Sequence, residues 1–409
     1  MPGETIGGEL RARTFWPIGF LAVLLTANGA SAGGLFPRSF PAGDAQSATV
    51  ADLDGDSVPD LITANRFSSD MSVMRGNGDG SFQAAVSFAV GDGPVSVAVA
   101  DLDGDTVPDL VIANRDSDDV SVLLGNGDGS VRAAVSFAVG DGPFSVAEAD
   151  LDGDSVPDLV TANFDSDDIS VLLGNGDGTF QAAVSFAAGD APFSVVVADL
   201  DGDSVPDLVT ANRDSDDVSV LRGNGDGSFQ AVVSFAAGDG PRSVAVADLD
   251  GDSVPDLVTA NDGSRDVSVL RGNGDGSFQA AASFAAVGRP RSVAVVDLDG
   301  DSVPDLVTAH SFSDDVSVLL GNGDGSFQAA LSFAAGDSPF SVVMADLDGD
   351  TAPDLVTANW ISDNVTVYLN QRVPAARPEI DIKPGSDPNS INPSLEGDLP
   401  GGDPWDGQR

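Results

Sequence analysis

The sequence contains no cysteine, one histidine and one tyrosine, and only 18 basic residues stand against 65 acidic ones. Without cysteine the chain can form no disulfide, no thiol nucleophile and no thiolate metal site. A Ser-His-Asp triad could be built only on His310. The formal net charge of −47 repels phosphate, so the composition argues against binding to nucleic acid or to an anionic membrane surface.

Residues 1–32 have the pattern of a cleaved secretory signal peptide. Arg11 and Arg13 supply a positive flank, Phe15–Leu25 supplies an apolar stretch, and Ala30-Ser31-Ala32 supplies a cleavage site. A membrane anchor is the alternative, but this apolar stretch is too short for the ~30 Å of hydrocarbon in a bilayer. We therefore expect a secreted protein, extracellular or at the cell surface, whose mature chain does not insert into a membrane.

An acidic decapeptide, DLDGDSVPDL in its first copy, recurs every 49 residues. The copies begin at Asp52, Asp101, Asp150, Asp199, Asp248, Asp297 and Asp346. One repeat unit contains four short apolar runs, at residues 96–102, 109–114, 120–124 and 131–137, bounded by Gly, Asn, Asp or Pro. Such runs are typical of strands, and four antiparallel strands repeated at this interval indicate the blade of a β-propeller.

The repeat also predicts how the ring closes. The fourth run is complete only six times, and residues 35–40 near the N-terminus resemble its missing end. The sequence therefore predicts an all-β, seven-bladed β-propeller over residues 33–371, closed by the N-terminal strand so that no sheet edge is left open. A solenoid of stacked hairpins is the alternative. Residues 372–409, rich in Pro, Gly and Asp, are interpreted as a mostly disordered tail and a truncated C-terminal module of a kind found in bacterial exported proteins.

The spacing of the acidic decapeptide favours a metal site. Carboxylates stand at positions 1, 3, 5 and 9, so a tight loop can point several of them into one cavity, and the residue at position 7 can offer its carbonyl. Hard oxygen ligands in this number suit Ca²⁺, whereas Mg²⁺ demands stricter octahedral geometry. Solvated Asp-Gly turns are the other interpretation. We expect up to seven Ca²⁺ ions, one in each loop.

The candidate ligands are Asp52, Asp54, Asp56, Val58 and Asp60; Asp101, Asp103, Asp105, Val107 and Asp109; Asp150, Asp152, Asp154, Val156 and Asp158; Asp199, Asp201, Asp203, Val205 and Asp207; Asp248, Asp250, Asp252, Val254 and Asp256; Asp297, Asp299, Asp301, Val303 and Asp305; and Asp346, Asp348, Asp350, Ala352 and Asp354.

The stretch DLDGDSVPDLVTANRDSDDVSVLRGNGDGSFQ resembles the FG-GAP/VCBS repeat family, which includes the propeller of integrin α-subunits. The resemblance covers residues 35–370 and implies a seven-bladed propeller with Ca²⁺ between the first two strands of each blade. Position 6 departs from the family pattern, because Ser57 and its Ser or Thr equivalents replace the usual glycine. The second motif, GNGDG, carries one carboxylate and is interpreted as a hairpin turn.

The repeats differ most in the loops that a propeller places on the face opposite the acidic decapeptides. Seven arginines fall there, and five of them, in three consecutive blades, are the candidate ligand-binding residues: Arg213, Arg242, Arg265, Arg289 and Arg291. Arginine and aromatic residues together suggest a carboxylated glycan or an acidic protein as partner. Neutral drift of exposed loops is the other interpretation.

Two classes of function follow from these patterns. The first is a secreted, Ca²⁺-binding, non-catalytic module for adhesion or ligand recognition, and a purely structural disc belongs to the same class. The second is an exported enzyme on a propeller scaffold, such as a polysaccharide lyase or phosphodiesterase. The scarcity of His, Tyr, Lys and Cys favours the first.

Overall fold

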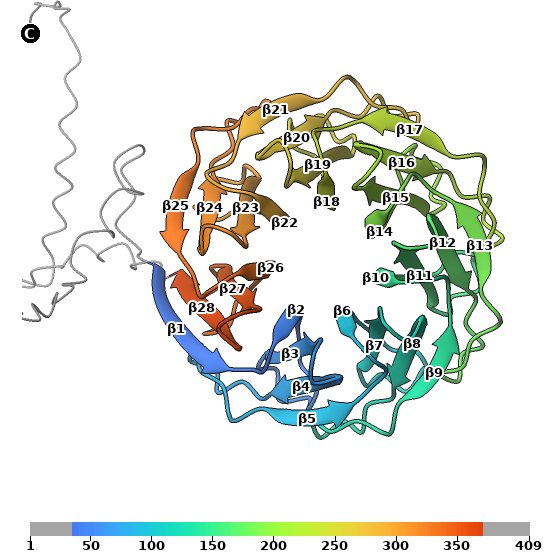
Figure 1. Ribbon diagram of the computed structural model, residues 1–409, viewed down its shortest axis with the longest axis vertical. Coiled ribbons are helices and arrows are strands. Elements are labelled where there is room, and N and C mark those ends of the chain that lie inside the picture. Colours follow the sequence, from blue (N-terminus) through green and yellow to red (C-terminus); the bar gives the residue numbers. More distant parts are fainter. Residues whose placement is uncertain (1–34, 371–409) are drawn as a thin grey trace, which may run out of the picture. The chain divides into compact units, whose positions relative to one another are not determined.

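The computed structural model describes residues 35–370, which form 28 strands and no helix. The predicted signal peptide and the predicted tail lie outside the described residues, so both remain predictions. Seven four-stranded antiparallel sheets follow one another around a ring (Figure 1), which confirms the predicted seven-bladed propeller. Within residues 35–370 no helix is long and apolar enough to cross a bilayer.

Each blade is numbered here by its innermost strand in chain order. The innermost strands are β2 (Ala45–Ala51), β6 (Pro94–Ala100), β10 (Pro143–Ala149), β14 (Pro192–Ala198), β18 (Pro241–Ala247), β22 (Pro290–Val296) and β26 (Pro339–Ala345). The second strands are β3 (Asp60–Asn65), β7 (Asp109–Asn114), β11 (Asp158–Asn163), β15 (Asp207–Asn212), β19 (Asp256–Asn261), β23 (Asp305–His310) and β27 (Asp354–Asn359).

The third and fourth strands lie farther from the ring axis (Figure 1). The third strands are β4 (Asp70–Met74), β8 (Asp119–Leu123), β12 (Asp168–Leu172), β16 (Asp217–Leu221), β20 (Asp266–Leu270), β24 (Asp315–Leu319) and β28 (Asn364–Asn370). The outermost strands are β5 (Val86–Ala89), β9 (Val135–Ala138), β13 (Val184–Ala187), β17 (Val233–Ala236), β21 (Ala282–Ala285), β25 (Leu331–Ala334) and β1 (Leu35–Pro41).

The ring closes through the N-terminal strand. β1 pairs antiparallel with β28, in register from Leu35 opposite Asn370 to Pro41 opposite Asn364. Figure 1 shows this as the blue strand lying beside the red one, in the same sheet as β26 and β27. The missing fourth run predicted that residues near the N-terminus complete the seventh blade. This prediction is confirmed.

The core lies between adjacent blades. The second strand of each blade is buried along its whole length, because neighbouring sheets cover both faces of its sheet. Between blades 2 and 3, for example, Val111 and Val120 pack in one cluster with Val146, Leu159 and Leu172. A fully buried Val or Leu contributes roughly 1.5–3 kcal/mol, so these interfaces hold the ring together.

The fourth strand is shorter than predicted. The apolar run at 131–137 was read as one strand, but the ladder of β9 covers only Val135–Ala138, and an isolated bridge joins Gly125 to Val131. In blade 3 the equivalent of Val131 is Phe180, which turns inward and meets Phe137 of blade 2 edge-on, with ring centroids 5.4 Å apart. The run therefore splits because its first half packs toward the neighbouring blade, while its second half forms the exposed outer strand.

Candidate metal centres and the opposite face

The loop between the first and second strands of each blade is here called the acidic loop, with Asp52 as position 1 of the first copy. Two residues with positive φ, Gly55 (+76°) and Ser57 (+67°), curl the backbone. Asp52 closes the curl by accepting hydrogen bonds from the amides of Gly55 and Ser57, both at 2.8 Å. At position 5, Asp56 accepts a hydrogen bond from the amide of Val58 at 2.8 Å.

Three carboxylates of each of the first five acidic loops converge, each with one oxygen within 4.8 Å of the others. Positions 1, 3 and 9 meet in four loops, and positions 1, 3 and 5 meet in the fourth blade. The triplets are Asp52, Asp54 and Asp60; Asp101, Asp103 and Asp109; Asp150, Asp152 and Asp158; Asp199, Asp201 and Asp203; and Asp248, Asp250 and Asp256. The predicted ligands at positions 1 and 3 are thus together, whereas position 5 joins in only one of these loops.

Position 9 is the buried end of the site. Asp60 is 1% exposed and accepts hydrogen bonds from the amides of Leu53 (3.0 Å) and Gly76 (2.9 Å). Burial raises its pKa, and the nearby carboxylates of Asp54 and Asp56 raise it further. The pKa is raised at position 9 in all seven blades, for the same reasons, and reaches about 6 in two of them.

These clusters could bind metal ions. Each gathers hard oxygen donors around a buried carboxylate, and the negative charges raise one another's proton affinity unless a cation neutralises them. Each carboxylate oxygen at positions 1 and 9 has more than one lone pair. Lone pairs therefore remain to bind a cation after these oxygens have accepted their backbone hydrogen bonds. No contact in the structure tests the carbonyl at position 7, so its role stays a prediction. The side chain of Val58 lies beside Gly76 and Gly78, where a Cβ added to either glycine would meet it.

Four acidic loops have an arginine beside position 3, which the sequence reasoning missed. The ion pairs are Arg75 with Asp54 (3.7 Å), Arg132 with Asp103 (3.7 Å), Arg222 with Asp201 (3.5 Å) and Arg271 with Asp250 (3.4 Å). In blades 3 and 6 the residue equivalent to Arg75 is Leu173 or Leu320. The seven loops are therefore not electrostatically equivalent.

The GNGDG motif, here called the glycine turn, connects blades. The amide of Gly227 in blade 4 donates to the carbonyl of Leu151 in the acidic loop of blade 3, at 3.1 Å. Equivalent bonds join Gly80 to Leu347, Gly129 to Leu53, Gly178 to Leu102 and Gly325 to Leu249. The aspartate of the turn accepts hydrogen bonds from the following Ser or Thr, which lowers its pKa. The motif is thus a turn, as predicted, and it is also hydrogen-bonded to the acidic loop of the preceding blade.

On the opposite face, the five candidate arginines divide into two groups. Three have partners within the protein. Arg242 is buried, with its guanidinium 3.0 Å from Asp262 and 4.8 Å from the ring centroid of Phe193. Arg291 donates to Ser311, and Arg213 pairs with Asp214 at 3.3 Å.

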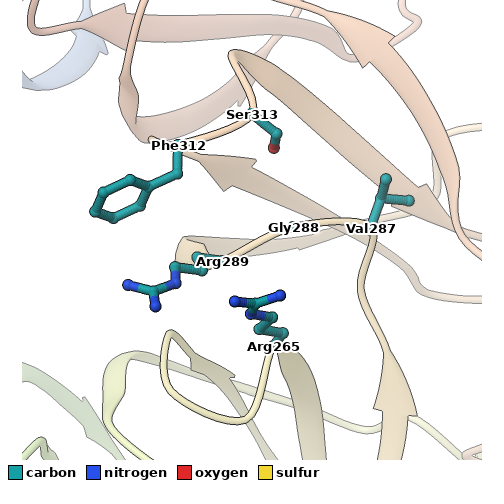
Figure 2. Close-up of a pocket in the computed structure, with 6 residues that line it drawn as sticks. All are labelled: Arg265, Val287, Gly288, Arg289, Phe312 and Ser313. Carbon is teal, nitrogen blue, oxygen red and sulfur yellow. The ribbon is translucent and has the colours of Figure 1, made fainter.

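Arg265 and Arg289 form the second group, because they line an open pocket of about 460 Å³ with Phe312 and Ser313. Figure 2 shows both side chains extending into the same space, with the ring of Phe312 beside Arg289. Sequence reasoning brought all five arginines together as one cluster, and it could not separate the three with an ion-pair or hydrogen-bond partner from the two that line the pocket.

Aromatic rings accompany these arginines at the inner ends of the blades. The rings of Phe144 and Phe193 stack with centroids 3.9 Å apart, and Phe164 packs against both. Arg115 lies over Phe144 at 5.4 Å. Trp360 contacts Phe67 and Phe340 on the other side of the ring. Phe144 and Phe193 each follow the proline that begins the innermost strand of the blade, and both lie at a bulge in the strand ladder. The bulge explains why these two side chains can turn toward one another.

His310 is structural. It takes the place of the asparagine that, in the other blades, ties the second strand to the third. Its Nε2 lies 2.9 Å from the hydroxyl oxygens of both Thr308 and Ser317. Burial lowers its pKa to about 4, so the ring is neutral near pH 7. The single tyrosine, Tyr368, is also buried, and it donates to the carbonyl of Ala334.

A family model described as FG-GAP-like repeat matches residues 52–112, 101–161, 150–210, 199–259, 248–308 and 299–357. This chain belongs to the FG-GAP-like repeat family. The six overlapping matches span the repeat region, so the predicted family is confirmed. No curated protein matches the FG-GAP propeller in sequence.

Several solved structures resemble the FG-GAP propeller in fold. BBS1N in complex with ARL6DN has a TM-score of 0.60 at 13% identity, covering 83% of this chain and 97% of that one. A catalytically inactive virginiamycin B lyase from Staphylococcus aureus, with quinupristin, has a TM-score of 0.56 at 12% identity, covering 82% and 99%. The periplasmic gluconolactonase PpgL of Pseudomonas aeruginosa has 0.55 at 18% identity, covering 72% and 86%. These likenesses concern the fold alone.

Proposed function

We propose that this FG-GAP propeller is an exported, Ca²⁺-binding recognition module that binds a glycan or an acidic protein segment and catalyses no reaction on it. The observation that carries the proposal is the contrast between its two faces. One face repeats the same acidic loop seven times with little change. The other face holds unlike residues, including arginines and aromatic rings that contact one another.

Calcium is the proposed ion because the acidic loops offer closely spaced oxygen donors, and Ca²⁺ accepts several oxygen ligands in variable geometry. An ion there would keep the buried position-9 carboxylates charged, which burial otherwise opposes. The ion would also join the acidic loop to the strand behind it, since position 9 already accepts a hydrogen bond from the glycine turn of the same blade. Up to seven Ca²⁺ ions would then act as structural clamps.

Recognition is favoured over catalysis by the positions of the usual catalytic side chains. His310 and Tyr368 are buried with hydrogen-bond partners, and the sequence has no cysteine. The aspartates of the acidic loops accept hydrogen bonds that shape those loops. The solved structures of similar fold include a protein–protein complex and two enzymes, so likeness of fold does not choose between the classes.

The proposal is tested on the purified protein in Ca²⁺ buffer, with arrays of acidic glycans, neutral glycans and acidic peptides. We expect saturable binding to acidic ligands that weakens with added salt. The same preparation is incubated with uronic-acid polymers and with phosphodiesters. Formation of an unsaturated or hydrolysed product would support the alternative, an exported enzyme such as a polysaccharide lyase or phosphodiesterase. Absence of binding to every ligand class would contradict recognition.

A further inference from the structure

Four of the seven junctions between blades contain the same hydrogen bond on the arginine-bearing face. In each of these four, an aspartate in the loop between the second and third strands accepts a hydrogen bond from the backbone of the link to the next blade. Each bond measures 2.8 Å, and the pairs are Asp118 with Gly142, Asp167 with Ala191, Asp216 with Gly240, and Asp314 with Ser338. This bond fixes the loop of one blade against the entry of the next.

The junction between blades 5 and 6 breaks this pattern on both sides. Arg265 stands where the neighbouring junction has Asp216, and Arg289 stands where it has Gly240. Gly288 replaces a third residue, Asp239. These three positions add +4 to the formal charge, and with Asp262 for Arg213 (−2) and Gly263 for Asp214 (+1) the junction as a whole is +3 relative to its neighbour. The aspartate-to-amide bond is therefore replaced by two arginines facing each other across the junction.

The replacement carries a local cost. Arg265 keeps the left-handed conformation of the aspartates it replaces, with φ +63°, although a long side chain disfavours that region. The positive charges of Arg265 and Arg289 also lie in the same pocket, and the hydrogen bond from aspartate to the backbone amide is lost. Sequences that break a local rule in this way tend to do so at functional sites. Here the broken rule coincides with an open pocket.

The pocket is lined by Arg265, Val287, Gly288, Arg289, Phe312 and Ser313. Its volume of about 460 Å³ is within the range of small-ligand sites. Two of its apolar side chains are exposed, Phe312 at 64% and Val287 at 51%. The guanidinium of Arg289 lies 4.9 Å from the centroid of the Phe312 ring (Figure 2). Cationic and apolar groups thus border the same open space.

The two guanidinium groups in this pocket have no acidic partner. Of the twelve arginines among residues 35–370, eight are in ion pairs with aspartates. Within the same residues no carboxylate lies within ion-pair distance of Arg265 or Arg289. In a chain with 65 acidic residues, this leaves both positive charges available to a ligand. Burial, and to a smaller extent neighbouring arginines that include Arg289, lower the pKa of Arg291 to about 10.

We propose that this junction pocket binds the carboxylate of an acidic sugar residue, with Arg265 and Arg289 holding the carboxylate. Arginine matches a carboxylate with two parallel N–H donors. The exposed ring of Phe312 would cover the apolar face of the sugar ring. The carboxylate belongs to the same sugar residue, so the arginines and Phe312 could contact it together. The hydroxyl of Ser313 donates to Asp315 and leaves its oxygen free to accept from a sugar hydroxyl. The proposal rests on the recognition function above and names its ligand and place.

The test compares the full protein with the double variant Arg265→Asp/Arg289→Gly, which places the residues of the neighbouring junction at these two positions. Because this variant can re-form the aspartate-to-amide bond, we expect it to fold with an equal or higher Tm. Calorimetric titration in Ca²⁺ buffer uses galacturonate and glucuronate oligosaccharides, their neutral counterparts, and an acidic peptide. We expect wild-type protein to bind the uronates at least tenfold more tightly than the neutral sugars, and the double variant to lose that binding. Arg38→Ala, in the outer strand β1 where Arg38 donates to the carbonyl of Asp79, serves as the matched control and should bind normally.

Four outcomes would overturn the assignment. Equal uronate affinity in wild type and in the double variant would place the ligand elsewhere, while the recognition function would stand. A neutral sugar that binds as tightly as its uronate would remove the role of the arginines. An acidic peptide that binds more tightly than the uronates, and is lost in the same variant, would assign the pocket to a protein partner. Absence of wild-type binding to every ligand would overturn both this inference and the recognition function.

Discussion

Position 6 of every acidic loop has a backbone conformation that its side chain disfavours. Ser57, Thr106, Ser155, Ser204, Ser253, Ser302 and Thr351 all have φ between +67° and +71°. The family pattern that the sequence resembles has glycine at this position, and glycine adopts a positive φ without steric cost. One missing glycine in a fixed motif is therefore enough to indicate where the loop has a strained backbone.

Substituting glycine at position 6 should stabilise the protein. For Ser204→Gly, relief of the left-handed strain is worth about 1–2 kcal/mol, and the greater freedom of glycine in the unfolded chain removes about 0.5–1 kcal/mol of it. We expect a net gain of roughly 0.5–1 kcal/mol in the free energy of unfolding, measured by urea denaturation in Ca²⁺. Ser204→Ala is the control and should give no gain, since alanine is strained in the same way.

The buried aspartates at position 9 should make the metal-free protein more stable in mild acid. The pKa of Asp305 and Asp354 is about 6 in the folded state, against an ordinary value of 3.8. Their contribution to stability is therefore fully present below pH 3.8 and is lost as the pH rises through about 6. In chelator, we expect Tm to rise when the pH is lowered from about 7 to about 5.

Calcium should reverse this dependence, because the ion competes with protons for the same carboxylates. With Ca²⁺ present, Tm should fall over the same pH interval. The aspartates of the glycine turns have lowered pKa values, so they act only below their ordinary value of 3.8 and do not interfere. A Tm that falls on acidification in chelator would show that the position-9 carboxylates are not held as described.

At the scale of elements, the acidic loop and the glycine turn form one unit that spans two blades. The repeat predicted both turns. Nothing in the sequence pattern indicated that the amide of the last glycine of GNGDG donates a hydrogen bond to the preceding blade. The same limit explains the error in the fourth strand. Val131 and Phe180 occupy equivalent positions at the start of an apolar run, and only the neighbouring blade determines that this position turns inward.

Two glycine substitutions in blade 4 separate strain from steric exclusion. Gly202 in the acidic loop and Gly227 in the glycine turn have φ of +79° and +75°. A Cβ on Gly202 meets nothing within 4 Å, whereas a Cβ on Gly227 would lie 2.8 Å from the side chain of Leu173 in blade 3. Gly202→Ala should cost about 1–2 kcal/mol from backbone strain alone. Gly227→Ala should cost more, as measured by urea denaturation, because the end of the Leu173 side chain must also move. Equal costs would contradict the close packing of Leu173 against the glycine turn.

Arginines beside position 3 should weaken individual metal sites. The guanidinium of Arg222 pairs with Asp201 and would repel a cation at the same carboxylate, whereas blade 3 has Leu173 at that place. We expect Arg222→Leu to raise the Ca²⁺ affinity of one site several-fold, and Leu173→Arg to lower that of another. Calorimetric titration with Ca²⁺ measures both. Unchanged isotherms in both variants would show that these arginines do not influence the ion.

At the scale of the whole ring, seven copies and one displaced strand were enough to predict the blade count and its closure. A fixed interval of 49 residues leaves little freedom, since each unit must bury its faces against the next. The opposite face was less predictable. Whether an arginine is buried, as Arg242 is, or open to a ligand, as Arg265 is, depends on residues in adjacent blades that no single repeat contains.

Charge is the property that links all three scales. Seven ions of charge +2 would add +14 to a formal charge of −47, and each would act on a buried carboxylate between two strands. An ion that binds only the folded state, at a free concentration 100 times its Kd, stabilises that state by about 2.7 kcal/mol per site. Metal binding and ring stability should therefore be strongly coupled.

Calorimetric unfolding of the purified protein, in Ca²⁺ and in excess chelator, tests this coupling most directly. We expect Tm to fall and the transition to broaden when the metal is removed, and both changes to reverse when Ca²⁺ is restored. Elemental analysis of the protein before chelation should find several calcium ions per chain. A metal-free protein that unfolds at the same temperature and with the same cooperativity in chelator would contradict the account.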